Sequence, residues 1–160
     1  MKILTQELRD KILSYVPKYP SKRAVTLPAL HIVHDALRHV PYEAIVEIAE
    51  LLELHPAEVY DTMSFYEFFK GEDERLGKTR LWICRGLACM LRGAYELIKQ
   101  AEQQLGIRCG QTTLDGQITL EFAECIGACD GAPACLRNDV HVMHMNPEKL
   151  NNLLRELQNL

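Results

Sequence analysis

Four of the six cysteines form two closely spaced pairs, and these pairs are the residues best suited to chemistry. Cys84 and Cys89 have four residues between them, and Cys125 and Cys129 have three. Four thiolates gathered at one point bind either a structural zinc ion or an iron–sulfur cluster. Paired zinc ligands are usually two residues apart, although up to four occur, so the wider spacing favours a diiron cluster and leaves zinc open. A thiol–disulfide oxidoreductase is disfavoured, because the chain has no Cys-x-x-Cys.

The residues beside the two pairs are suited to hold and tune a cluster. Gly86 and Gly127 lie inside the loops, where glycine lets the backbone come close enough for N–H groups to point at cluster sulfides. Glu124 and Asp130 flank the second pair. Their negative charges are predicted to lower the reduction potential of the site.

Two further cysteines fall outside the pairs. Cys135 is predicted to be a buried apolar thiol and Cys109 an incidental surface thiol. The N-terminus lacks the cationic start and apolar stretch of a secretory signal, so we expect a reducing compartment. Metal or redox chemistry is commoner there than structural disulfides.

The histidines are weaker candidates for metal ligands. His31 and His34 share one predicted helix, with His39 nearby, but no H-E-x-x-H signature accompanies them. We expect ordinary packed or surface side chains there. His141 and His144 fall in the last predicted strand and raise the question of a Rieske centre, in which two histidines replace two cysteines. Strand alternation would place them on opposite faces, which is wrong for a shared iron.

The second half of the chain alternates strands and helices. Apolar spacing and turn residues predict a strand at 80–83, a helix at 91–105 stopped by Gly106, a weak strand within 107–113, a strand at 118–122, a hairpin of 134–136 and 140–143 turning at Asn138-Asp139, and a last helix begun by Asn146-Pro147. Each cysteine pair directly follows a strand, so neighbouring strands would deliver all four thiols to one end of the sheet. A small mixed sheet with helices on its faces resembles the thioredoxin-like fold.

Prolines divide the first half of the chain into four short helices. These are predicted at 8–16, ended by Pro17 and Pro20, at 28–40, at 41–52 and at 56–60. We expect the aromatic run Phe65, Tyr66, Phe68 and Phe69 to form a hydrophobic latch onto the next domain. The charged stretch 71–77 is predicted to be a linker.

Composition and charge exclude several classes of protein. The chain of 160 residues is 48% hydrophobic and 25% charged, which is typical of a folded domain and not of a disordered or fibrous chain. A net charge of −4 argues against nucleic acid as a partner, and no apolar run is long enough for membrane insertion. Residues 41–75 hold ten acids and two bases, and this stretch either forms solvated helix faces or meets a basic partner.

The two cysteine loops also identify a family. Cys-x4-Cys followed by Glu-Cys-Ile-Gly-Ala-Cys-Asp-Gly-Ala-Pro at 124–133 resembles the small thioredoxin-like [2Fe–2S] subunit, the E-type subunit, of NADH:quinone oxidoreductase (respiratory complex I). Equivalent subunits of NAD-linked hydrogenases and formate dehydrogenases are similar. The helical half ending in Ser64-Phe65-Tyr66 resembles the same subunits.

The resemblance implies an α/β chain with a helical subdomain at 1–75 and a thioredoxin-like [2Fe–2S] domain at 76–160. It implies that Cys84, Cys89, Cys125 and Cys129 hold the cluster. It further implies a larger partner subunit that binds FMN and NADH, and with which the cluster exchanges single electrons. The chain would then be a non-catalytic subunit of an oxidoreductase, cytoplasmic or peripheral to the inner face of the plasma membrane. The alternative of a different class is a zinc-stapled binding module with no redox role.

Overall fold

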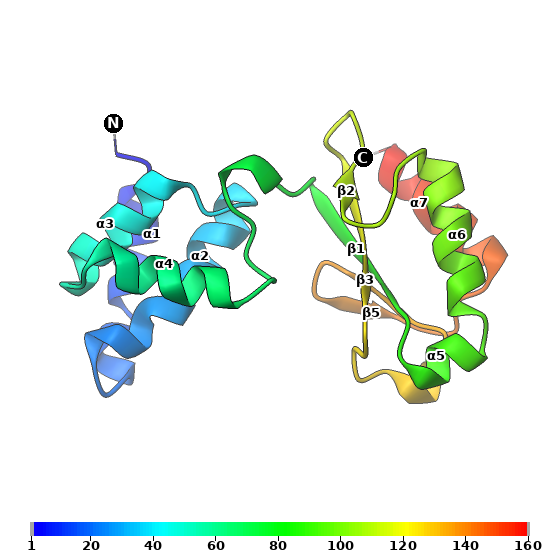
Figure 1. Cartoon of the computed structure of the whole chain (residues 1–160), viewed down its shortest axis with the longest axis horizontal. Coiled ribbons are helices and arrows are strands. Elements are labelled where there is room, and N and C mark those ends of the chain that lie inside the picture. The colour runs from blue at the N-terminus through cyan, green and yellow to red at the C-terminus, as the bar shows by residue number, and fades with distance from the viewer. Residues whose placement is uncertain (1, 160) are drawn as a thin grey trace. The chain divides into compact units, whose positions relative to one another are not determined.

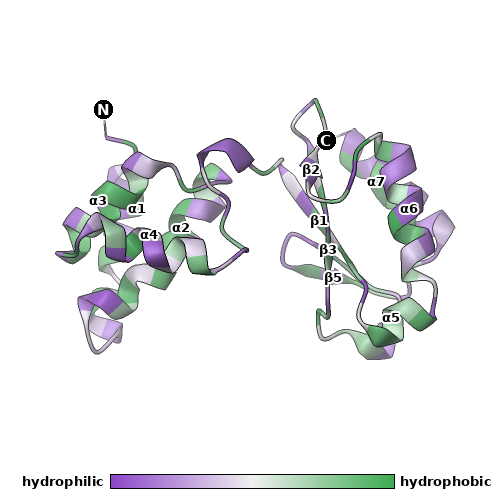
Figure 2. Ribbon diagram, viewed as in Figure 1, coloured by the Kyte–Doolittle hydropathy of each residue, from purple (hydrophilic) through white to green (hydrophobic). Residues whose placement is uncertain are grey.

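The computed structural model describes residues 2–159 and divides into two compact units after Arg75 (Figure 1). The first unit is helical, and the second contains a sheet with helices. Each unit has a hydrophobic core of its own. In Figure 2 the helices of both units carry apolar and polar positions side by side, as amphipathic helices do. The predicted α/β class, with a helical bundle followed by a small mixed sheet, is confirmed.

Over residues 2–75, the helical unit consists of four α-helices and three short 3-10 turns. They are α1 (Gln6–Leu13), η1 (Val16–Lys18), η2 (Lys22–Val25), α2 (Thr26–Leu37), α3 (Tyr42–Leu52), α4 (Pro56–Phe65) and η3 (Glu72–Glu74). All four predicted helices exist, with shifted ends. Helix α2 begins before Pro28, because η2 runs directly into it. It ends at Leu37, and the next residue, Arg38, has a left-handed φ of 66°. Helix α4 continues past Tyr60 to Phe65.

The aromatic run after α4 packs differently from the predicted latch. Phe69 is buried in the core of the helical unit, and Phe68 packs against that core. The rings of His31 and Phe69 lie 4.9 Å apart, and those of His34 and Phe68 lie 5.1 Å apart. Phe65, by contrast, is 80% exposed. The latch prediction is therefore wrong for Phe68 and Phe69, because the histidine face of α2 covers them within their own unit.

In its described part, residues 76–159, the sheet unit contains five strands in the order β2-β3-β1-β4-β5. Its elements are β1 (Thr79–Cys84), α5 (Leu87–Leu91), α6 (Ala94–Leu105), β2 (Gln111–Thr112), β3 (Ile118–Ala123), η4 (Cys129–Gly131), β4 (Cys135–Arg137), β5 (Val140–Val142) and α7 (Pro147–Gln158). Strands β1 and β3 are parallel, and the other pairings are antiparallel. The predicted order of strands and helices is confirmed, except that the helix predicted at 91–105 begins at Ala94 and is preceded by the short helix α5, which was not predicted.

Helices α6 and α7 lie side by side against one face of the sheet (Figure 1). Leu97 of α6 and Leu154 of α7 meet the same inward row of β1 and β3, which includes Leu81 and Leu120. The expectation of a small mixed sheet covered by helices is met by these two long helices, which pack on the same face. Asn146 caps α7, and its side chain accepts a hydrogen bond from the Lys149 N–H at 2.8 Å.

Candidate metal centre

The parallel pairing of β1 and β3 brings the two cysteine loops to one edge of the sheet. Cys84, the last residue of β1, lies opposite Ala123, the last residue of β3. Beyond this point the Arg85 N–H donates to the Ala123 carbonyl at 2.8 Å. The prediction that two neighbouring strands deliver their loops to the same end of the sheet is confirmed. In such sheets this end is where ligands bind.

The first cysteine pair is buried. Cys84 is 2% exposed and Cys89 1% exposed. The chain turns at Gly86 into α5, and this short helix returns Cys89 toward the end of β1. The Cys84 N–H donates to the Ala134 carbonyl at 3.1 Å, which fixes Cys84 to the neighbouring chain segment before β4.

The second cysteine pair is exposed. The Sγ atoms of Cys125 and Cys129 lie 3.8 Å apart. Gly127, between them, has a φ of 77°, a left-handed value that glycine adopts without the strain a side chain would impose. Cys129 begins η4, and the Ala132–Pro133 peptide after it is cis.

The two pairs approach each other across the sheet edge. Cys84 Sγ lies 3.6 Å from the Glu124 carbonyl oxygen. A side chain on Gly86 would collide with that same carbonyl, so glycine is needed there for the two loops to approach each other, a reason other than the predicted approach of N–H groups to cluster sulfides. The thiols stand as two pairs, and no three ligating side chains among residues 2–159 are gathered tightly enough to enclose one ion as they stand.

The thiols influence one another electrostatically. Burial raises the pKa of Cys89 to about 11, and the neighbouring Cys84 and Cys129 add to this rise. The pKa of Cys129 is raised by its hydrogen bond with Cys125 and by the proximity of Cys125 and Cys84. Thiols that resist ionisation because of one another are suited to share a cationic centre, which would stabilise all of the thiolates.

Small and apolar side chains surround the thiols. A separate buried cluster contains Cys84 and Cys89 together with four alanines, and Ala88 and Ile126 pack against it. The alanines are Ala94, Ala128, Ala132 and Ala134. Small side chains leave room beside the sulfur atoms, and apolar ones limit the access of water.

An ion pair joins the two loops beside the thiols, and sequence reasoning missed it. Arg85 follows Cys84, Glu124 precedes Cys125, and the Arg85 Nε donates to the Glu124 carboxylate at 2.9 Å. The Arg85 guanidinium also stacks on Phe122, 3.7 Å from the ring centre. Glu124 was expected to make the site more negative, but Arg85 offsets its charge. An arginine directly after Cys84 was the available signal, and only the β1–β3 register reveals its partner.

The other two cysteines and the two histidines of the last predicted strand are not part of the two cysteine pairs. Cys135 is buried, as predicted, and burial raises its pKa to about 12. Cys109 is half-buried rather than on the surface, and burial raises its pKa to about 11. His141 Nε2 lies 2.8 Å from the Ile126 carbonyl of the second loop. His144 follows the end of β5 with a φ of 52°, so strand alternation does not apply to it and that argument was wrong.

Four thiols at one edge of a mixed sheet define a protein that binds metal or exchanges electrons through cysteine. The sequence profile of the thioredoxin-like [2Fe–2S] ferredoxins matches residues 12–158. The chain therefore belongs to this family, its cofactor is a [2Fe–2S] cluster, and its role is electron transfer. The predicted thioredoxin-like fold, family and cofactor are confirmed.

Three known proteins illustrate the relationship. An E-type subunit (E 2) of the NADH-quinone oxidoreductase of Rhizobium meliloti is 34% identical over 151 residues, which cover 94% of this chain and 89% of that protein. The HndA subunit of the NADP-reducing hydrogenase of Solidesulfovibrio fructosivorans is 27% identical over 154 residues, covering 96% of this chain and 89% of that one. A crystal structure of NAD+-reducing [NiFe]-hydrogenase in the air-oxidized state superimposes with a TM-score of 0.72 and 24% identity. That match covers 81% of this chain and 22% of the hydrogenase chain, and it supports the fold.

Among residues 2–159, no helix combines the length and the apolar character needed to cross a bilayer.

Proposed function

We propose that the chain is the electron-carrying subunit of an NADH-oxidising complex and holds its cluster through Cys84, Cys89, Cys125 and Cys129. The observation that carries this proposal is the placement of the two cysteine pairs on neighbouring loops that follow the ends of β1 and β3. Related chains belong to an NADH-quinone oxidoreductase and to an NADP-reducing hydrogenase, so either type of complex is a candidate host. An NAD-linked formate dehydrogenase is a further alternative of the same class.

The proposed partner is a larger subunit that binds FMN and NADH. In this arrangement the chain does not turn over NADH alone and depends on the partner to oxidise it. We place the complex in the cytoplasm, with this chain peripheral to the inner face of the plasma membrane. The support for the partner is that the related subunits, by name, are parts of NADH- or NADP-linked enzymes.

A [2Fe–2S] cluster accepts and returns one electron at a time. The chain's own residues determine where that exchange takes place. Cys84 and Cys89 would hold the inner iron away from water, because both side chains are buried. Cys125 and Cys129 are exposed, so the second loop is the face at which a partner approaches. The Arg85–Glu124 pair ties this loop to the first and keeps the local charge balanced.

The cofactor assignment is tested by elemental analysis and visible absorption of anaerobically purified protein. We expect iron and sulfide in equal amounts, and a brown colour that bleaches with dithionite. Cys125→Ser should abolish the colour, whereas the matched Cys109→Ser should retain it. Stoichiometric zinc without iron would overturn the electron-carrier function, and retention of the cluster in Cys125→Ser would overturn the ligand set.

The partner assignment is tested by reduction with NADH. The chain alone should remain oxidised when NADH is added, because it is proposed to lack the flavin. Addition of the purified flavin subunit should then bleach the cluster. Direct bleaching by NADH without the partner would contradict the non-catalytic role.

A further inference from the structure

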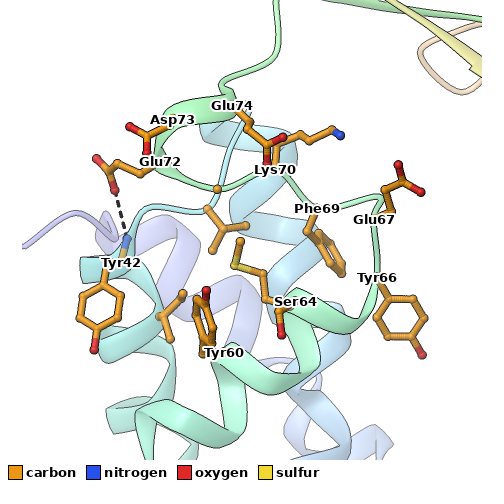
Figure 3. Close-up of a pocket in the computed structure, with 14 residues that line it drawn as sticks. Tyr42, Tyr60, Ser64, Tyr66, Glu67, Phe69, Lys70, Glu72, Asp73 and Glu74 are labelled. Carbon is orange, nitrogen blue, oxygen red and sulfur yellow. Dashed lines mark hydrogen bonds between the residues drawn. The ribbon is translucent and has the colours of Figure 1, made fainter. Parts of the chain in front are cut away.

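The helical unit carries a groove that the proposed electron transfer does not use. Its volume is about 580 Å³, and it lies between the start of α3, the second half of α4 and the 66–74 segment (Figure 3). All of its lining residues belong to the helical unit. A groove of this size accommodates several side chains of a bound segment rather than a single ion.

The groove has a fixed apolar floor. The floor consists of four buried side chains: Val40, Ile45, Met63 and Phe69. The Val40 N–H donates to the Lys70 carbonyl at 2.8 Å, and the Tyr42 N–H donates to the Glu72 carboxylate at 3.2 Å, drawn as the dashed line in Figure 3. These bonds join the 70–72 segment to the start of α3, so the shape of the groove exists before anything binds.

Exposed tyrosines form the walls of the groove. Tyr42 is 61%, Tyr60 48% and Tyr66 42% exposed, and Figure 3 shows Tyr42 and Tyr60 along the same side. Large aromatic side chains are concentrated in protein interfaces, where they bury much surface at little entropic cost. Their ring faces also attract lysine and arginine.

The rim of the groove is mostly acidic, although one base, Lys70, also lines the groove. Glu67, Glu72, Asp73 and Glu74 are all exposed, and the three consecutive acids form one 3-10 turn above the floor (Figure 3). Within residues 2–159, Glu67, Asp73 and Glu74 make no ion pair. The rim therefore presents carboxylates that a cationic partner can bind.

We propose that this groove binds a segment of the partner subunit in which a lysine or arginine stands between apolar side chains. The apolar side chains would rest on the floor, the cation would lie against the Tyr42 and Tyr60 rings, and the acidic rim would neutralise its charge. This inference rests on the proposed function only in requiring a partner subunit. It assigns the acidic stretch at 41–75 to recognition, in a unit that contains no cysteine.

A second copy of this chain is a poorer occupant. Seven bases lie in residues 1–40, but Arg9, Lys22 and Arg23 already pair with Glu47, Glu53 and Glu58 of the same unit. Two such chains would also bring together net charges of −4 each. A nucleic acid would be repelled by the same rim.

The test compares two double variants of the cluster-loaded full chain that change net charge equally. Glu67→Lys with Glu74→Lys alters the rim, and Asp35→Lys with Glu50→Lys alters exposed positions outside the groove. Affinity for the purified flavin subunit is measured at low and high salt. We expect the rim variant to bind about tenfold more weakly and the control to bind within about twofold of the wild type, because close charge complementarity outweighs net charge. Tyr60→Ala should also weaken binding, through loss of the aromatic wall.

Each outcome bears on the inference separately. Circular dichroism and cluster absorption verify that every variant is folded and loaded. Equal weakening in the two double variants, or no change in the rim variant, would overturn the inference and leave the proposed function intact. If sedimentation shows that the wild type is a dimer and the rim variant is a monomer, the inference is overturned, because the groove then binds a second copy of this chain. Wild-type chain that fails to bind any flavin subunit would overturn the proposed function and this inference with it.

Discussion

The two units of the chain use their surfaces for different purposes. In the sheet unit, the ends of β1 and β3 gather four thiols, and bases and acids are balanced at nine each over residues 76–160. The helical unit contains no cysteine and instead exposes tyrosines and carboxylates around a groove. With the groove assigned as proposed, the sheet unit carries the electron-transfer site and the helical unit adds a separate recognition surface. Changes in one core should therefore leave the chemistry of the other intact.

The largest expected effect comes from one added methyl group between the cysteine loops. Gly86→Ala would drive a Cβ into the Glu124 carbonyl, which is backbone and cannot move aside cheaply. We expect the variant to lose most of its cluster absorption after reconstitution. The matched change in the other unit, Gly71→Ala, meets only the tip of Met63 at 3.5 Å and should load normally. Equal loading of the two variants would contradict the close approach of the loops.

We propose that the two units are two domains, 1–75 and 76–160. Core truncations should then destabilise one unit without affecting the other. Ile48→Ala removes a fully buried side chain of the helical unit, and Leu120→Ala removes one from the sheet unit. Each is expected to cost roughly 3 kcal/mol, but only in its own unit. Thermal unfolding followed by cluster absorption should respond to Leu120→Ala and not to Ile48→Ala. A single transition that shifts equally in both variants would argue for one cooperative domain.

A smaller effect is expected at Glu47, a buried carboxylate of the helical unit. Burial raises the pKa of Glu47. Hydrogen bonds from the Ile3 N–H, at 2.6 Å, and from Arg9 lower it by more, so the pKa lies below its ordinary value of 4.5. Glu47→Gln should reduce the free energy of unfolding by about 2 kcal/mol at neutral pH.

The pH dependence follows from the lowered pKa of Glu47. Its contribution to stability is complete above the unfolded pKa of 4.5 and is lost as pH falls through the lower folded value. Urea unfolding at a series of pH values should therefore show wild type and variant converging below 4.5. If the difference in unfolding free energy between wild type and Glu47→Gln stayed constant down to acidic pH, the contribution of the ion pair would be contradicted. The cluster absorption at neutral pH should be the same in both proteins.

The smallest expected effect is on the reduction potential, at the Arg85–Glu124 pair. Glu124→Gln leaves Arg85 unpaired near the thiols and should raise the midpoint potential, because positive charge favours the reduced cluster. Arg85→Gln should lower it. The control Glu156→Gln breaks the Arg137–Glu156 pair of α7 and β4 and should leave the midpoint unchanged. Redox titration followed by electron paramagnetic resonance measures all three, and an unchanged midpoint in both pair variants would remove the electrostatic role.

Local sequence signals predicted most elements, and they failed where packing decided the outcome. Gly106 ends its helix and Asn146 begins one, as expected, because caps depend on a few neighbouring residues. Phe69 lies in the core of its own unit and Phe68 packs against that core, because α2 places His31 and His34 against them. No spacing rule within the aromatic run contains that information.

The sequence by itself predicted the cofactor class, which the family match confirms, and it supplied the proposed donor set: two cysteine pairs, each following a strand. Tertiary structure decided which thiols are buried and which are exposed, and it paired Arg85 with Glu124 across the loops. It also formed the groove at Tyr42 and Tyr60 from segments that are distant along the chain. The physical reason is that bond-forming groups are local properties of residues, whereas burial, charge pairing and cavities depend on contacts between segments far apart in the sequence.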